Sequence, residues 1–111
     1  MPLFSVVISL YNKEQYILNT INSVLNQTVQ DFEIIIVNDG STDQSAQVVK
    51  TIDDNRISLL TTVNNGAAAA RNLGIEKASG TYIALLDGDD FWYPFFLEET
   101  QKINHLAKEL L

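Results

Sequence analysis

The 111-residue sequence has no cysteine, few basic residues and no long apolar run. The absence of cysteine excludes disulfides, thiol catalysis and zinc–thiolate sites. Seven lysine and arginine residues against 14 acidic residues give a net charge of −7, which argues against nucleic acid as a partner, because phosphate contacts need concentrated positive charge. No apolar run approaches the ~20 residues of a membrane-spanning helix, and the N-terminus lacks a signal-peptide pattern. We therefore expect a domain that is soluble as it stands.

The glycine-rich motifs that hold phosphates in many nucleotide-binding proteins are also missing. No Gly-x-Gly-x-x-Gly follows the first apolar segment, and no Gly-x-x-x-x-Gly-Lys-Ser/Thr occurs in the sequence, which argues against a dinucleotide fold and a P-loop. If phosphates bind here, a metal ion would have to hold them. Hydrophobic residues make up 46% of the chain, which is enough for the core of one domain.

An acidic cluster follows directly on the apolar segment 81–86. Asp87, Asp89 and Asp90 lie within four residues, and carboxylates held this close repel one another unless a cation such as Mg²⁺ or Mn²⁺ binds them. Gly88 lets the backbone bend so that Asp87 and Asp89 can face one ion. The alternative is a solvated acidic turn. Its position at the end of a predicted strand favours the metal site, because ligands of open α/β sheets bind there.

The whole chain alternates between short apolar, β-branched segments and segments with helical periodicity. Strands are expected at residues 3–10, 32–37, 57–62 and 81–86, and helices at residues 12–26, 42–52, 67–78 and 94–110. This alternation is typical of right-handed βαβ units. We therefore predict an α/β fold with a mostly parallel sheet and helices on both faces.

Sequence signals are expected to mark five helix ends. Asn12 is the predicted N-cap of the first helix, Thr42 or Asp43 that of the second, Gly66 the entry to the third and Gly80 its C-terminal glycine. Pro94 suits the first turn of the last helix. That helix is expected to have an apolar side made of Phe95, Phe96, Leu97, Ile103, Leu106 and Leu110, with His105 on the surface.

Parallel strands would bring several polar residues to one edge of the sheet, because their carboxyl ends meet there. Tyr11 could stack on a ring at this edge or simply belong to the surface. Asp39 could accept hydrogen bonds from a base or sugar, or serve only the geometry of its turn. Arg71 could reach a phosphate or pair with an acid.

Five segments of the chain, in order, resemble the motifs of family 2 glycosyltransferases. They are SVVISLYN (5–12), SVLNQT (23–28), EIIIVNDGSTD (33–43), NG with ARNLGI (65–66 and 70–75) and LDGDD (86–90), the last similar to the DxD motif. Each segment alone is weak, but five in order make the resemblance specific. It implies a GT-A fold, of which residues 1–111 would be the Rossmann-like, N-terminal nucleotide-sugar-binding part, without the acceptor-binding half.

The resemblance implies transfer of a sugar, with inversion, from a nucleotide diphosphate-sugar to an acceptor hydroxyl. UDP-sugars are the expected donors, Mn²⁺ or Mg²⁺ the expected cofactor, and a saccharide or lipid-linked saccharide of the cell envelope the expected acceptor. The implied nucleotide-sugar contacts are Ser9 and Tyr11 at the base, Asp39 bonded to it, Arg71 near the nucleotide and Asp87 near the ribose, with Asp89 and Asp87 at the metal. The sequence departs from the family pattern at Ser9, where proline is usual, and at Asn38, where aspartate is usual.

No catalytic residue is assigned within the chain. In this family the general base comes from the acceptor half, downstream of the DxD motif, so we expect this part to be inactive alone; Asp90 is the internal alternative. Without the remaining strands, apolar surface around the fourth strand and the last helix should be exposed, and self-association would follow. The expected location is the cytoplasm or the inner face of the membrane. The alternative reading is a flavodoxin-like Mg²⁺-binding signalling or interaction module without transferase activity.

Overall fold

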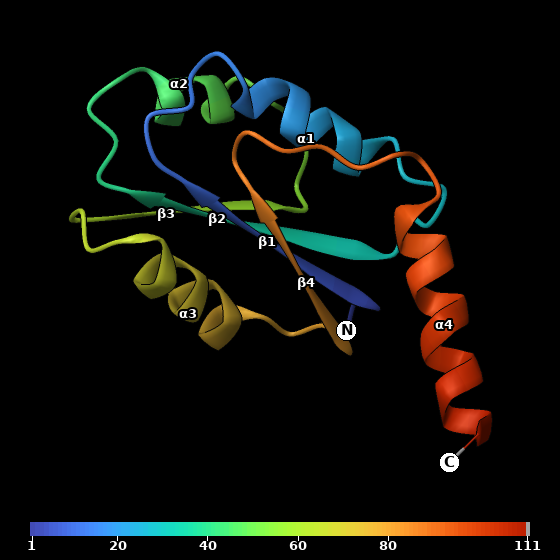
Figure 1. The fold of residues 1–111 in the computed structure, drawn as a ribbon. Coiled ribbons are helices and arrows are strands. Elements are labelled where there is room, and N and C mark those ends of the chain that lie inside the picture. Colours follow the sequence, from blue (N-terminus) through green and yellow to red (C-terminus); the bar gives the residue numbers. More distant parts are fainter. Residues whose placement is uncertain (111) are drawn as a thin grey trace.

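The computed structural model describes the backbone of residues 1–110 and the side chains of residues 1–103. Strands and helices alternate along this part of the chain (Figure 1). They are β1 (Phe4–Leu10), α1 (Ile17–Leu25), β2 (Phe32–Asp39), α2 (Ser45–Lys50), β3 (Ile57–Thr62), α3 (Ala67–Lys77), β4 (Tyr82–Asp87) and α4 (Phe96–Leu110). All eight predicted elements are present, and α1 and α2 are shorter than expected.

The four strands form one sheet in the order β3-β2-β1-β4, and every neighbouring pair is parallel. The central strands β1 and β2 are almost wholly buried, as their continuous branched sequences predict. The order matches the first four strands of a Rossmann sheet, whereas a flavodoxin-like sheet would place β3 beside β1. The α/β prediction is confirmed, and the flavodoxin-like alternative is wrong.

Helices cover both faces of the sheet. Successive side chains of the central strands point to opposite faces, so each face carries apolar side chains that a helix buries. On one face Ile8 and Ile36 belong to the main core together with Ile21 of α1, and on the other face Ile35 packs with Ala70 of α3. Figure 1 accordingly shows α1 and α2 on one side of the sheet and α3 on the other. Three layers result, and the carboxyl ends of the strands remain accessible between them.

The predicted capping role of Asn12 is wrong. Helix α1 begins at Ile17, and Asn12 lies five residues earlier with a φ of 50°, a left-handed conformation that asparagine tolerates better than most residues. Its Oδ1 accepts hydrogen bonds from the backbone N–H groups of Thr42 at 2.8 Å and Asp43 at 3.3 Å. Asn12 therefore joins the loop after β1 to the loop after β2 instead of starting a helix.

The other predicted helix ends are partly confirmed. Gly66 immediately precedes α3 with a φ of 97°. The N-cap of α2 is Gln44 and not Thr42 or Asp43, although the Asp43 carboxylate accepts a hydrogen bond from the N–H of Ser45, where α2 begins. Gly80 has another role than predicted, since α3 ends at Lys77 and its C-cap, Ala78, is already extended. A Cβ at Gly80 would lie 2.7 Å from the backbone nitrogen of Ser5, so the glycine is needed where the chain passes β1.

The last helix begins at Phe96, two residues after Pro94, and Figure 1 shows it leading away from the sheet. Of its predicted apolar side, Leu97 is buried in the main core, whereas Phe95, Phe96 and Ile103 are exposed. The predictions for Leu106, Leu110 and His105 fall on side chains outside the described residues.

Apolar side chains are also exposed on the edge strand β4, at Ile83 and Leu85. The expected apolar surface around β4 and α4 is therefore present, while self-association through it stays a prediction. Within the described part of the chain, none of the helices is both long and apolar enough to cross a bilayer.

Glu33 joins three segments at the amino ends of the strands. Its Oε2 accepts hydrogen bonds from the Ser5 hydroxyl of β1 and from the backbone N–H and hydroxyl of Ser79, at 2.7 and 2.9 Å. Partial burial alone would raise the pKa of the Glu33 carboxyl, but these hydrogen bonds outweigh it and hold the pKa below its usual value.

We expect Glu33→Gln to lower the stability of the chain at neutral pH by on the order of 1 kcal/mol, because charge-assisted hydrogen bonds become neutral ones. A carboxyl whose folded-state pKa lies below the ordinary value of 4.5 stabilises fully above that value and loses its contribution as pH falls through the folded-state pKa. Urea denaturation at pH 7 and at successively lower pH should give a flatter pH dependence for Glu33→Gln. The exposed Glu76→Gln is the control, and equal slopes in the two variants would contradict the assignment.

Candidate functional site

A cavity of about 410 Å³ opens at the carboxyl ends of β1, β2 and β4. It lies where the strand order reverses, between β1 and β4, which is the usual ligand site of such sheets. All six residues that were expected to bind the nucleotide-sugar or the metal line this cavity: Ser9, Tyr11, Asp39, Arg71, Asp87 and Asp89. The fold thus brings together side chains from four separate segments of the chain.

The acidic cluster is fixed to the end of β1. Strand register places Asp87 beside Ser9, whose hydroxyl donates a hydrogen bond to Asp87 Oδ1 at 3.1 Å. The chain then turns, with the N–H of Asp90 donating to the carbonyl of Asp87 at 3.0 Å. As a result, carboxylate oxygens of Asp87, Asp89 and Asp90 all lie within 4.8 Å of one another and are exposed to solvent. Three hard oxygen donors with an open side suit a divalent ion such as Mg²⁺ or Mn²⁺.

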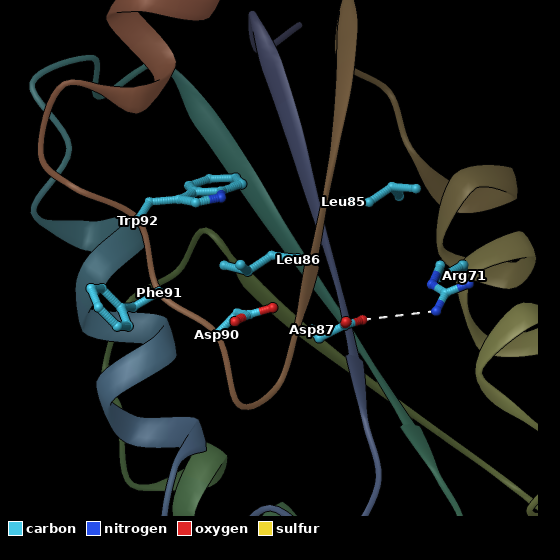
Figure 2. A pocket seen from close by; sticks show the side chains of 7 residues that line it. All are labelled: Arg71, Leu85, Leu86, Asp87, Asp90, Phe91 and Trp92. Atoms are coloured by element: carbon cyan, nitrogen blue, oxygen red, sulfur yellow. Dashed lines mark ion pairs between the residues drawn. The ribbon is translucent and has the colours of Figure 1, made fainter.

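Two cationic side chains flank this cluster. Lys13 Nζ lies 3.3 Å from Asp89 Oδ2, and Arg71 Nη2 lies 3.9 Å from Asp87 Oδ1, as the dashed line in Figure 2 marks. All four side chains are at least 39% exposed, so these ion pairs are weak and can rearrange when a ligand enters. The cavity therefore offers both carboxylates for a cation and positive charge for an anion.

Asp39 fixes a loop that lines one side of the cavity. It is only 4% exposed, and its two carboxylate oxygens accept hydrogen bonds from the N–H groups of Asn65 at 2.7 Å and Gly66 at 3.1 Å. The carboxylate thus fixes the loop between β3 and α3 and not its own turn, in which the N–H of Ser41 donates to Asn38 instead. A contact to a nucleobase stays a prediction. Tyr11 lies at the cavity with 45% of its surface exposed.

Sequence reasoning missed two residues of the cavity. Lys13 was not singled out, although its place just after the first strand was a signal that could have found it. Asn64 gave no signal, because its position depends on the loop that Asp39 holds; its Nδ2 donates to the Asp39 carbonyl at 3.1 Å. Both line the cavity beside the predicted residues.

A second cavity of about 460 Å³ lies along the edge of β4 and shares Arg71 and Asp87 with the first. Figure 2 shows Arg71 and Leu85 on one side of this strand, and Asp90 and Trp92 on the other. The acidic cluster therefore separates two adjoining spaces, one between the strand ends and one along the sheet edge.

We expect Lys13→Met to tighten Mn²⁺ binding by up to about fivefold, because an exposed ion pair that the metal must displace is worth ~0–1 kcal/mol. Isothermal titration of metal into the wild-type chain and the variant measures this. Lys77→Met removes the same charge from an exposed position at the end of α3 and should leave the affinity unchanged. Weaker Mn²⁺ binding by Lys13→Met would show that the lysine does not compete with the ion.

Comparison with known proteins gives related sequences. The sequence model described as glycosyl transferase family 2 matches residues 5–103. An uncharacterized glycosyltransferase of Haemophilus influenzae is 49% identical over 94 residues, which are 82% of this chain and 38% of that protein. The uncharacterized glycosyltransferase EpsJ of Bacillus subtilis is 44% identical over 93 residues, 82% of this chain and 27% of that protein. The chain thus spans well under half the length of these relatives.

Solved structures share the fold. TarS of S. aureus, residues 1–349 in complex with UDP-GlcNAc, superposes with a TM-score of 0.82 at 30% identity, over 89% of this chain and 30% of that one. The mannosyltransferase PcManGT of Pyrobaculum calidifontis, in complex with GDP-Man and Mn²⁺, gives a TM-score of 0.75 at 26% identity, over 82% of this chain and 28% of that one. The predicted GT-A fold is confirmed. With a family match over nearly its whole length, the chain belongs to glycosyl transferase family 2.

Proposed function

We propose that this chain binds a nucleotide diphosphate-sugar together with a divalent metal ion, and forms the donor-binding part of an inverting glycosyltransferase. One observation carries the proposal. A single cavity at the strand ends is lined by side chains suited to a base, to phosphates and to a metal, and three carboxylates meet at its edge within 4.8 Å.

The metal would be held by Asp89 and Asp87, with Asp90 close enough to join them. When bound, a divalent ion supplies charge that stabilises a departing diphosphate. Arg71 and Lys13 lie beside the same carboxylates and would pair with phosphate oxygens once the ion neutralises the acids. The PcManGT complex contains Mn²⁺, so Mn²⁺ is the first ion to test, with Mg²⁺ as the alternative.

The nucleoside would occupy the inner part of the cavity. Tyr11 offers an exposed ring on which a base can stack, Ser9 lies beside it at the end of β1, and Asp87 would approach the ribose. Asp39 lies on the opposite side of the cavity. Its carboxylate oxygens would accept a hydrogen bond from the base with the lone pairs that the N–H groups of Asn65 and Gly66 leave free. TarS is known with UDP-GlcNAc and with UDP, so a UDP-sugar is the first donor to test.

No residue of this chain is proposed as the general base. Deprotonating the acceptor hydroxyl in an inverting transfer needs a carboxylate on the acceptor side, and the relatives that this chain matches are much longer than it. We assign the base and the acceptor contacts to that further part, and the acceptor to the saccharides or lipid-linked saccharides of cell-envelope polysaccharide synthesis. The chain alone should bind donor without transferring its sugar.

Calorimetric titration tests this function directly. UDP and UDP-GlcNAc, with GDP as comparison, are titrated into the chain with Mn²⁺, with Mg²⁺ and with a chelator. We expect binding of the uridine nucleotides in the presence of metal and its loss with the chelator. A folded chain that binds neither nucleotide nor metal under any of these conditions would overturn the proposal.

A further inference from the structure

The segment that carries Asp89 and Asp90 has no regular secondary structure of its own. Between the end of β4 and the start of α4, residues 88–95 form only turns and irregular backbone. Such a segment holds its carboxylates in a fixed arrangement only if its backbone groups find partners elsewhere. Several of these partners are side chains of α1 and of Gln27 just after it, about 70 residues earlier in the chain.

Three polar side chains bind the segment. Thr20 and Ser23 lie within α1, and Gln27 follows two residues after the end of that helix. The Thr20 hydroxyl donates to the carbonyl of Gly88 at 3.0 Å, and the Ser23 hydroxyl accepts from the N–H of Trp92 at 3.2 Å.

The third of these side chains binds twice. The amide of Gln27 donates to the carbonyl of Tyr93 at 2.7 Å and accepts from the N–H of Leu97 at 3.0 Å. Thr20, Ser23 and Gln27 therefore satisfy four backbone groups of the segment and of the first turn of α4, while Ile17, Ile21 and Val24 of α1 are buried in the core.

Burial makes these hydrogen bonds hard to replace. Thr20 is 1% exposed and Gln27 2% exposed, so solvent cannot readily take the place of either side chain. A buried carbonyl that loses its donor keeps the full cost of its desolvation. Removing the Thr20 hydroxyl should therefore make the backbone at Gly88 move.

Gly88 is where such a movement would matter most. Its N–H donates to the carbonyl of Ser9 at 2.9 Å, and its carbonyl accepts from Thr20. The residue between Asp87 and Asp89 is thus fixed on both sides, to β1 and to α1. The carbonyl that Thr20 holds belongs to the peptide group leading into Asp89, so this bond sets the direction in which the Asp89 side chain leaves the backbone.

We propose that Thr20, supported by Ser23 and Gln27, is a positioning residue for the metal site: it fixes the acidic segment so that the three carboxylates converge before an ion binds. The inference rests on the proposed function, because it concerns the affinity for that ion. Groups that orient metal ligands typically change metal affinity by ~10–100-fold when they are replaced. Thr20 touches none of the carboxylates that would hold the metal.

Four forms of the chain test this: wild type, Thr20→Val, Thr20→Ser and Val24→Ala. Valine keeps the branched shape of threonine but lacks the donor, whereas serine keeps the hydroxyl. Val24 lies on the same helix and is wholly buried in the core, so Val24→Ala destabilises the fold without removing a side-chain hydrogen bond to residues 88–97. Mn²⁺ affinity is measured by electron paramagnetic resonance titration, and the backbone of residues 88–97 is followed by amide hydrogen exchange.

We expect Thr20→Val to bind Mn²⁺ about tenfold more weakly and to exchange faster in residues 88–97. Thr20→Ser and Val24→Ala should bind Mn²⁺ as the wild type does, although Val24→Ala melts at a lower temperature. Equal Mn²⁺ affinity in Thr20→Val and the wild type would overturn the inference, as would equal losses in Thr20→Val and Val24→Ala. A wild-type chain that binds neither Mn²⁺ nor a uridine nucleotide would overturn the proposed function, and unchanged exchange in Thr20→Val would then overturn the positioning role separately.

Discussion

Replacing Asp89 by asparagine is expected to weaken Mn²⁺ binding by at least about a hundredfold, more than the ~10–100-fold typical of groups that only orient the ligands. Asp89 is exposed and forms one ion pair, with Lys13, so the fold should not need it. An amide keeps the shape of the side chain but lacks the charge that a hard divalent ion prefers. Calorimetric titration of Mn²⁺, with a melting curve for each protein, measures both properties.

The matched control is Asp53→Asn. Asp53 is exposed in the loop between α2 and β3, at the amino ends of the strands, and the change in charge is the same. Its Mn²⁺ affinity should equal that of the wild type. If Asp89→Asn and Asp53→Asn bind Mn²⁺ equally well, the acidic cluster at the end of β4 is a solvated turn and the metal site lies elsewhere.

Replacing Asp39 by alanine is expected to lower the free energy of unfolding by about 3 kcal/mol, since hydrogen bonds to a charged group contribute ~1.5–3 kcal/mol each. The change leaves the N–H groups of Asn65 and Gly66 without their acceptor. The loop before α3 should then become mobile, and nucleotide binding should weaken with it, because this loop lines the cavity. Urea denaturation and a UDP titration with Mn²⁺ measure the two effects.

Asp31→Ala is the control for Asp39→Ala. Asp31 is exposed just before β2, and a surface change of this kind typically alters stability by less than ~0.5 kcal/mol. Asp39→Asn should be intermediate, because its amide can accept from one N–H group but not from both. An Asp39→Ala protein as stable as Asp31→Ala would contradict the role assigned to the buried carboxylate.

The fold could be predicted from the sequence because the central strands β1 and β2 are rich in apolar, β-branched residues. The β-branched, apolar segments of β1 and β2 are typical of strands that are buried on both faces. Because helices alternate with the strands, a parallel sheet is the expected arrangement. The gathering of Tyr11, Asp39 and Asp89 in one cavity follows from the same topology, since parallel strands end at one edge.

Features that depend on contacts between distant segments were not accessible in this way. Asn12 has the residue type and position of a helix N-cap, but its Oδ1 accepts hydrogen bonds from the loop after β2. Gly80 has the position of a glycine that ends a helix, but a glycine is needed there because a Cβ would clash with Ser5. Thr20 drew no attention as a hydroxyl within a helix, because its partner, Gly88, lies 68 residues away. Local pattern cannot show which distant backbone a side chain meets.

The most direct test of the proposed donor site is a crystal structure of the chain grown with UDP and Mn²⁺, with anomalous scattering recorded to locate the metal. The proposal predicts an anomalous peak bonded to Asp89, with the diphosphate beside it and the uracil in the cavity between Tyr11 and Asp39. A nucleotide bound away from the carboxyl ends of the strands, or a manganese peak without contact to Asp87, Asp89 or Asp90, would contradict it.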